Sequence, residues 1–183
     1  MAQFFEVHPD NPPARLLKQA AADSLRRIRG VDDKHHLTLL CRDLSELANY
    51  ARVDNKQFRL LKAATPGPYT FILEASKEVP RRLSHPSRKT IGLRVPEHKA
   101  LQALLEIHGA PLLATTLIPR DGSEAISDPQ DITGPLEREL AAVIDAGACH
   151  KEPTTVIDLT PMGDGDEPVV VRQGRGELAR LGL

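Results

Sequence analysis

The feature that most constrains the fold is the stretch of 29 residues from 89 to 117, where two strand-like segments flank one helical segment. Residues 89–95 (KTIGLRV) and 111–117 (PLLATTL) are rich in residues that strands favour. Between them, Pro96 suits the first turn of a helix and Gly109 suits its end. Leu101, Leu104, Leu105 and His108 recur at helical spacing in this interval. The pattern predicts a compact β-α-β unit, for which a right-handed parallel crossover is the usual arrangement.

Further segments of both kinds occur along the chain. Asp43 and Asp54 each precede a helical pattern, and Asp43 is followed three residues later by Glu46, as in a capping box. In the second pattern, Phe58, Leu61 and Ala64 are expected on one face. The other expected strands are residues 37–41, 69–75, 154–160 and 168–172, the last two forming a hairpin, and the other expected helices are residues 14–28, 43–49, 54–64 and 135–143. We therefore expect a single α/β domain over residues 1–183: a twisted, open sheet of parallel and antiparallel strands with helices packed on it.

The formal net charge of −1 hides an uneven distribution of charge. Residues 77–99 hold seven Lys or Arg against two acids, whereas residues 119–168 hold twelve acids against three bases. One basic surface and one acidic surface are expected, and the basic one would favour a phosphate or a polyanion. The sequence has neither a membrane-length apolar run nor a leader, so we expect a soluble, cytoplasmic protein.

Several standard sites are absent from the sequence. It has no P-loop, dinucleotide fingerprint, HExxH or GxSxG motif, and Cys41 and Cys149 lack a CxxC partner. The adjacent His35 and His36 would point to opposite sides of a strand, so no protein-bound metal is expected. Lys34, His35 and His36 are expected on a mobile, solvated loop before the strand at residues 37–41. Arginines and threonines remain at the ends of expected strands, namely Arg27, Arg29, Thr90, Arg94, Thr116 and Arg172. Guanidinium groups bind phosphate and carboxylate through paired hydrogen bonds, so this set predicts a site for a nucleotide and a small acid.

Four separated motifs carry a resemblance to a known family. The strings TPGPYTFILEA, KTIGLRVPEHKALQALLEIHGAPLLATT, PTTVIDLT and VVVRQG stand in the order and spacing that are typical of the YrdC/YciO family. The resemblance covers the chain from FFEVHPDNP onward. The strings HPDNP, CRDLSEL, EVPRRL and RKTIGLRVP are most similar to the YciO branch of that family.

This resemblance implies a fold and an activity. The family fold is a twisted α/β sheet with a large, positively charged concave face that suits nucleotides or double-stranded RNA. Its catalytic members convert L-threonine, bicarbonate and ATP, with Mg²⁺ carried by the nucleotide, into threonylcarbamoyl-AMP and diphosphate. That reaction is the first step in making threonylcarbamoyladenosine in tRNA. The resemblance implies no tightly bound cofactor.

The family's ligand contacts transfer to individual positions of this sequence. The resemblance assigns nucleotide contacts to Arg27, Arg29, Thr90, Thr116 and Arg172. It assigns threonine contacts to Arg94 for the carboxylate, to the backbone of Ala114 and to the hydroxyl of Thr154. These residues would position the substrates and stabilise charge, and none would act as a nucleophile.

The sequence departs from the family pattern at two places. Ile118 stands where the family has the asparagine of an SxN triplet, which argues against efficient ATP handling because an apolar side chain cannot replace an amide's hydrogen bonds. In addition, a family strand and loop of about 28 residues, with the threonine-binding PTD motif, is absent near Ala21 and Asp23. Either the chain has lost a core strand or the printed sequence omits it. We favour the second, because deleting a central strand would expose strand edges and apolar faces.

A binding function without catalysis is the main alternative. Arg81, Arg82, Arg88 and Lys89 lie in a basic stretch without aromatic residues, which suits contacts to the backbone of tRNA or other double-stranded RNA. A sensor that binds a nucleotide without turnover is the third alternative.

Overall fold

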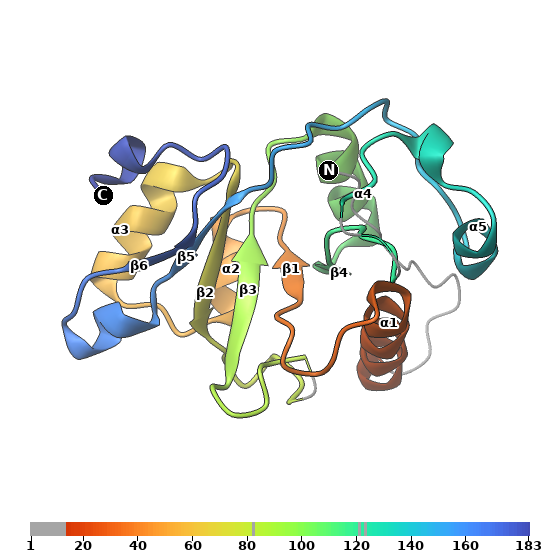
Figure 1. Cartoon of the computed structure of the whole chain (residues 1–183). Helices are drawn as coiled ribbons and strands as arrows, with labels where there is room; N and C mark the ends of the chain where they lie inside the picture. Colours follow the sequence, from red (N-terminus) through yellow and green to blue (C-terminus); the bar gives the residue numbers. More distant parts are fainter. Residues whose placement is uncertain (1–13, 82, 121, 123) are drawn as a thin grey trace.

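The computed structural model describes residues 14–81, 83–120, 122 and 124–183, and Figure 1 shows their arrangement. Within these residues, six strands form one sheet in the order β4-β1-β3-β2-β5-β6. The strands are β1 (Thr38–Leu40), β2 (Tyr69–Glu74), β3 (Thr90–Arg94), β4 (Leu112–Ala114), β5 (Thr155–Asp158) and β6 (Val169–Arg172). The helices are α1 (Ala14–Arg29), α2 (Leu44–Tyr50), α3 (Asn55–Ala64), α4 (Lys99–His108) and α5 (Pro135–Glu139), with short 3-10 turns η1 (Pro129–Asp131), η2 (Thr160–Asp164) and η3 (Leu178–Leu181).

The strand pairings confirm the expected mixed sheet. β1 runs parallel to β3, and β2 runs parallel to β5. The pairs β1–β4, β2–β3 and β5–β6 are antiparallel, so the hairpin expected at the end of the chain is also confirmed. The order of strands and helices along the chain is therefore the predicted one, with shorter elements at several positions.

The predicted parallel crossover between residues 89 and 117 is wrong. The strand, helix and second strand are present, but β1 lies between β3 and β4, and β4 runs antiparallel to both. Leu40 of β1 pairs with Arg94, the last residue of β3, and with Leu112, the first residue of β4. β4 thus begins at the end of the sheet where β3 finishes. Helix α4 packs at this same end of the sheet. It therefore does not return the chain to the opposite end, as a parallel crossover would require.

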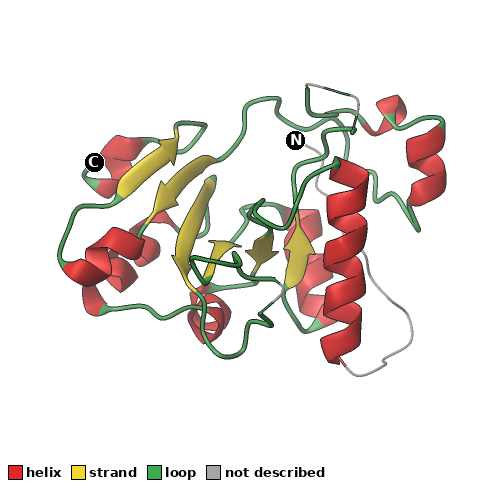
Figure 2. Ribbon diagram, turned by 60° about the horizontal axis from the view of Figure 1, so that its bottom comes forward, coloured by secondary structure: helices red, strands yellow, loops and turns green. Residues whose placement is uncertain are grey.

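One face of the sheet forms the main hydrophobic core. Side chains alternate between faces along a strand, and Leu39, Phe71, Leu93 and Ile157 all point to this face, where each is at most 5% exposed. Residues of α2, α3 and the second half of α1 cover them. Figure 2 shows the long α1 beside the β4 edge of the sheet, and the two elements are in contact.

Helix α3 shows one packing error in the sequence prediction. Leu61 and Ala64 are fully buried as expected, but Phe58 is 42% exposed. Gln57 is buried instead, and its side-chain amide donates to the carbonyl of Leu159 at 2.8 Å while its oxygen accepts from the backbone N–H of Asp54. A polar residue can therefore take the core position because the nitrogen and the oxygen of its side-chain amide each have a hydrogen-bond partner. The same contact completes a capping box at Asp54.

The opposite face of the sheet is covered only in part. Leu101 and Leu105 of α4 pack against Leu40, Leu112 and Ala114, which places α4 over the ends of β1 and β4. The helix starts at Lys99, after its N-cap His98 and three residues later than the expected start at Pro96. It is capped at its end by Gly109, whose φ of 67° is the left-handed conformation that glycine favours. No helix of the described residues packs on the rest of this face, which forms the floor of a cleft.

The residues after β6 cross back over the start of β5. The N–H of Arg175 donates to the carbonyl of Pro153 at 2.9 Å, and the N–H of Gly174 donates to the hydroxyl of Thr155 at 3.0 Å. A Cβ atom on Gly174 would lie 2.3 Å from the oxygen of Pro153, so this close approach of two backbones requires glycine. The helices of the described residues include none long and apolar enough to cross a membrane.

Candidate functional site

The candidate site is a cleft of about 480 Å³ on the uncovered face of the sheet. All six strands contribute to its lining, together with the loops before β1, after β4 and before β5. Four permanently charged side chains line it, and all are cations: Arg29, Lys34, Lys151 and Arg172. Its lining residues, all of them within the described part of the chain, include no Asp or Glu. A cleft with charges of one sign focuses the electric field and attracts anions.

Hydroxyl groups and a glycine form the floor of this cleft. The hydroxyls of Thr70 and Thr154 share a hydrogen bond of 3.0 Å, and both residues are at most 9% exposed. Thr38 stands next to Gly92 in the sheet, and a Cβ atom at Gly92 would lie 3.0 Å from the Thr38 hydroxyl. Because Gly92 has no side chain, nothing projects from the sheet into the cleft at this position, which leaves room for a ligand.

The cleft brings together most of the ligand contacts that the family resemblance implies. Arg29, Ala114, Thr116, Thr154 and Arg172 line it. Arg29 donates to the carbonyl of Ile118 at 3.2 Å, and Arg172 donates to the carbonyl of Thr154 at 3.0 Å. Burial lowers the pKa of both guanidinium groups from their usual value, but it leaves them charged at neutral pH.

The structure places the other residues named from the sequence around the cleft. Arg27 is exposed and pairs with Glu139 of α5 at 3.4 Å, so its side chain lies outside the lining. Thr90 adjoins the cleft through a hydrogen bond of 3.0 Å to His36, which lines it. Arg81, Arg88 and Lys89 are exposed on the loop before β3, and Arg82 lies outside the described residues.

Arg94 is a buried cation beside the cleft and is not among its lining residues. It is 8% exposed and follows Thr90 and Gly92 on the same face of β3, so the register puts it between Leu40 and Thr70. Burial, followed by the charge of Arg175, lowers its pKa to about 10. Its Nε atom is buried without a hydrogen-bond partner, and no acidic side chain of the described residues forms an ion pair with it. A buried cation without a counter-ion is costly, which is typical of a side chain held for a ligand.

Two histidines complete the cleft, although neither was predicted to lie there. We expected Lys34, His35 and His36 on a mobile, solvated loop, but both histidines are only partly exposed and line the cleft with Lys34. The ring of His36 stacks on that of His85 with centroids 4.9 Å apart. Burial lowers the pKa of His36, with further lowering by His85, Arg88 and His35 and an opposing effect of Asp158. Burial and the charges of Arg29 and Arg26 likewise lower the pKa of His35, whereas the charge of Asp32 raises it.

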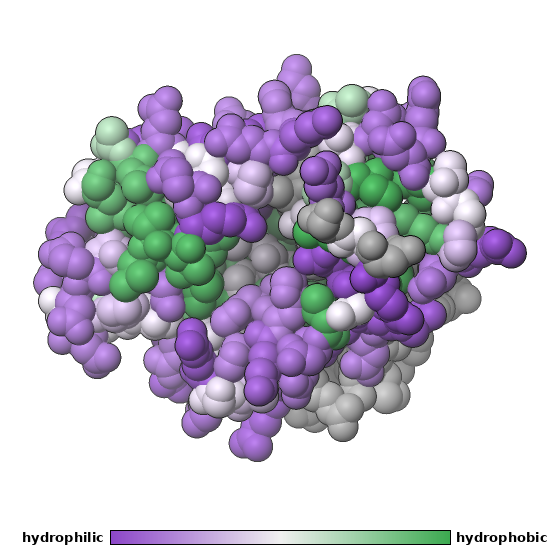
Figure 3. Space-filling view, in the orientation of Figure 1, coloured by the Kyte–Doolittle hydropathy of each residue, from purple (hydrophilic) through white to green (hydrophobic). Residues whose placement is uncertain are grey.

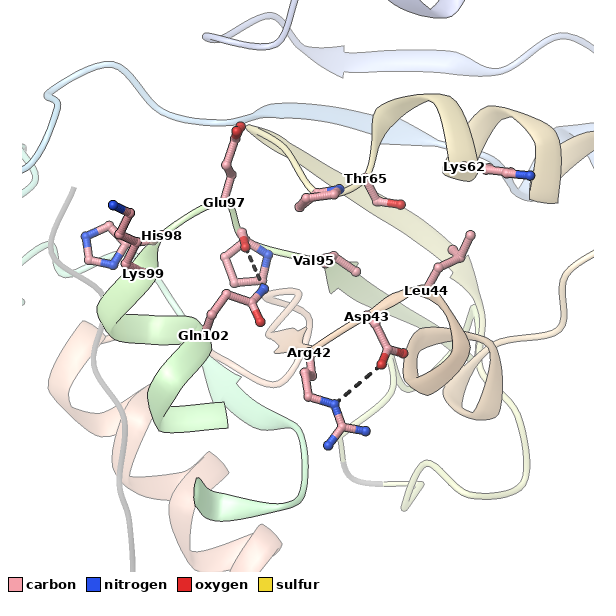
Figure 4. A pocket seen from close by; sticks show the side chains of 12 residues that line it. Arg42, Asp43, Leu44, Lys62, Thr65, Val95, Glu97, His98, Lys99 and Gln102 are labelled. Carbon is pink, nitrogen blue, oxygen red and sulfur yellow. Dashed lines mark hydrogen bonds and ion pairs between the residues drawn. The ribbon is translucent and has the colours of Figure 1, made fainter. Parts of the chain in front are cut away.

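A second and larger hollow, of about 690 Å³, lies elsewhere on the molecule (Figure 4). Its charged lining is mixed, because Asp43 and Glu97 stand among Arg42, Lys62 and Lys99. Arg42 already donates to Asp43 at 3.4 Å. This hollow shows no preference for one sign of charge, so the smaller cleft is the better candidate for a site.

The surface around the cleft is mainly hydrophilic, with one larger apolar area (Figure 3). That area lies over β6, at the left of the view, where Val169, Val170 and Val171 are exposed. Val171 also lines the cleft, together with Ile72 and Val156. The cleft thus has one apolar wall beside its cationic residues, which suits a ligand that is partly apolar and partly anionic. Within the described residues, no group of three or more His, Cys, Asp and Glu is placed to hold a metal ion.

Comparison with known proteins identifies close and distant relatives of the chain. The family model for Sua5, YciO and YrdC, described as "Telomere recombination", matches residues 13–174. The chain is 45% identical to the uncharacterized protein YciO of Escherichia coli (strain K12), over 97% of this chain and 98% of that protein. The crystal structure of E. coli YciO matches with a TM-score of 0.80, covering 99% of this chain and all of that chain.

More distant relatives have a named activity or ligand. The threonylcarbamoyl-AMP synthase of Bos taurus is 28% identical over 81% of this chain and 48% of its own length. The crystal structure of P. abyssi Sua5 complexed with L-threonine shares the fold, with a TM-score of 0.76 and 24% identity over 86% of this chain and 45% of that one. The alignment with E. coli YciO extends over 206 positions but covers 97% of the 183 residues of this chain, about 178, so about 28 positions have no counterpart in this chain (206 − 178). The absent segment predicted near Ala21 and Asp23 has this length, and its place in the chain stays a prediction.

Proposed function

Because the chain belongs to the Sua5/YciO/YrdC family and is distantly related to threonylcarbamoyl-AMP synthases, we propose that its cleft binds ATP and L-threonine and forms threonylcarbamoyl-AMP. The observation that carries this proposal is the charged lining of the cleft, which consists of cations alone. ATP brings a triphosphate and threonine brings a carboxylate, and both need such a lining. The complex of P. abyssi Sua5 with L-threonine supports an amino acid as the second ligand.

The proposed arrangement separates the two substrates along the cleft. Arg94 binds the carboxylate of threonine, while the hydroxyl of Thr154 and the backbone of Ala114 hold the rest of the amino acid. Arg29, Arg172 and Thr116 contact the phosphates of ATP, and Thr90 lies at the same end through its bond to His36. The carbonyl of Ile118 holds the guanidinium of Arg29 in place, so this position keeps a role for its backbone although its side chain is apolar.

The reaction needs no nucleophile from the protein. Threonine's amine combines with carbon dioxide from bicarbonate to give a carbamate and release a proton. A carbamate oxygen then attacks the α-phosphorus of ATP in line, the bond to the bridging oxygen breaks, and diphosphate leaves. Charge develops on the phosphates during this step, and cations fixed in advance stabilise it without reorganisation. Mg²⁺ enters with ATP as part of the substrate.

We expect purified protein to release diphosphate from ATP only when L-threonine and bicarbonate are both present. Coupled detection of diphosphate measures the rate, and replacing ATP by ATP labelled in the α-phosphate identifies threonylcarbamoyl-AMP directly. The variant Arg29→Ala should lower kcat/KM about tenfold to a hundredfold, because one charged contact to phosphate is removed. The exposed Arg59→Ala, on α3, is the matched control and should keep the wild-type rate.

Two results would contradict this proposal. One is diphosphate release that is equal with and without L-threonine. The other is tight, salt-sensitive binding of duplex RNA that needs Arg81 and Arg88 while no diphosphate forms, since this combination describes a binding protein rather than a synthase.

The histidines of the cleft predict a pH dependence for ATP binding. The pKa values of His35 and His36 lie below the usual 6.5 in the free protein, so both rings are mostly neutral at pH 7. Bound phosphates would raise these pKa values, so the complex takes up protons and affinity rises as the pH falls through about 6.5, by up to roughly tenfold per pH unit for each proton. Calorimetry at pH 6.5 in buffers of different ionisation enthalpy measures this uptake. Protons that ATP itself gains or loses on binding contribute equally in every variant. The complex of His36→Asn with ATP should therefore take up fewer protons than the wild-type complex, whereas that of the exposed His108→Asn should take up as many as wild type.

A further inference from the structure

Arg94 lies near a second arginine, Arg175, to which the family resemblance gives no role. The sheet register continues to Thr70 beside Arg94, and the hydroxyl of Thr70 shares a hydrogen bond with that of Thr154. Pro153, next to Thr154, accepts from the backbone N–H of Arg175, and the charge of Arg175 contributes to the lowered pKa of Arg94. Neither arginine is among the residues that line the cleft, but each adjoins residues that do, Thr70 beside Arg94 and Pro153 beside Arg175.

The position of Arg175 is fixed by the backbone around it. Its N–H donates to Pro153, and the single hydroxyl of Thr155 accepts from the N–H of Gly174 and donates to the carbonyl of Gly176 at 2.7 Å. Thr155 is fully buried, so these bonds are shielded from water. The side chain of Arg175 therefore starts from a rigid point rather than from a flexible chain end.

Each of the two guanidinium groups has one buried donor, its Nε atom, without a partner. The Nε atoms of Arg94 and Arg175 are both buried and without a hydrogen-bond partner in the described residues, and neither side chain forms an ion pair there. Arg172, which is assigned to the phosphates of ATP, already donates to the carbonyl of Thr154. Two like charges with unused donors and no acid between them are unfavourable in the empty protein, and an anion placed between them would satisfy both.

We propose that Arg175 binds the carboxylate of the amino-acid substrate together with Arg94, so that one carboxylate oxygen faces each guanidinium group. This inference rests on the proposed function of the cleft, because it assigns a second ligand to the same carboxylate. It also gives the site its selectivity for an α-carboxylate over a neutral end, since two cations, one buried and one partly exposed, reject an uncharged group.

Calorimetric titration of wild type, Arg175→Ala and Arg175→Gln with L-threonine, with L-threoninamide and with ATP tests this assignment. Wild type should bind L-threonine and reject the amide. Both variants should bind L-threonine at least tenfold more weakly and keep their affinity for ATP within about threefold, and Arg59→Ala should match wild type throughout. Without ligand, Arg175→Ala should melt no lower than wild type, because its removal relieves repulsion of Arg94, whereas an arginine with a merely structural role would leave a less stable protein.

The outcomes separate this inference from the proposal on which it rests. If wild type binds L-threonine and the Arg175 variants bind it equally well, the assignment of Arg175 is overturned and the proposed function stands. If wild type binds no L-threonine, the proposed function is overturned. In that event, thermal stabilisation by acetate at constant ionic strength decides the role of Arg175: a larger effect on wild type than on Arg175→Ala supports a two-arginine carboxylate site, and equal effects overturn it.

Discussion

Replacing Arg94 by alanine is expected to abolish threonine-dependent diphosphate release while ATP still binds. The guanidinium is 8% exposed and has no acidic partner in the described residues, so its charge is available for the substrate's carboxylate. Loss of a charge-assisted contact in a buried site costs about 2–4 kcal/mol, which corresponds to a fall in kcat/KM of roughly thirtyfold to a thousandfold. Initial rates at varied L-threonine, together with the affinity for ATP from titration, measure the two effects separately.

Arg94→Lys provides the informative comparison. Lysine keeps the charge but has no planar pair of donors, so we expect it to recover only a small part of the activity. The free energy of unfolding should rise or stay equal in Arg94→Ala, because a buried cation is removed from an apolar setting near Arg175. A variant that loses stability and ATP affinity together would show that Arg94 supports the fold instead of the amino acid.

Replacing Phe71 by alanine should produce the largest loss of stability. Phe71 is fully buried on the core face of β2, between two neighbouring strands and against the ring of Tyr69 at a centroid distance of 6.1 Å. Removal of a buried phenylalanine costs about 3–5 kcal/mol, which for a chain of this length lowers Tm by roughly 10 °C. Urea and thermal denaturation followed by circular dichroism measure the change.

Phe58→Ala is the matched control for this substitution. It removes the same atoms from α3, but Phe58 is 42% exposed. We expect a loss of at most about 1 kcal/mol, because most of the ring is already in contact with water. Equal losses in the two variants would mean that the exposed ring is buried in solution by another surface.

The sequence predicted the elements of the fold better than the directions in which they run. Runs such as residues 69–75 form strands because their branched and aromatic side chains fill the core, and this information is local. The orientation of β4 is not local, since it depends on α4 packing over Leu40 and Leu112 at one end of the sheet. Likewise, the helical pattern after Asp54 could not show that Gln57 rather than Phe58 enters the core. That choice depends on the carbonyl of Leu159, about a hundred residues away.

The same limit explains which parts of the candidate site were found from the sequence. Arg29, Thr154 and Arg172 stand beside strands whose motifs resemble a known family, so their roles could be assigned before the fold was described. Arg175 has no such motif. It becomes visible only when the backbone from Gly174 to Gly176 is seen to cross the start of β5. The histidines were missed for a similar reason, because His36 contacts His85 and Thr90, and His35 contacts Thr115, all of them distant in the chain.

Because all six strands line the cleft, a ligand can bind there only when the whole sheet has formed. Residues as far apart in the chain as Arg29 and Arg172 share the cleft, so no fragment of the sheet can assemble it alone. An unfolded chain then has no affinity for the ligands, and a ligand at a hundred times its Kd adds the full linkage energy of about 2.7 kcal/mol to the stability of the native state. The amount of ligand bound at saturation therefore measures the fraction of molecules in which the whole sheet is folded.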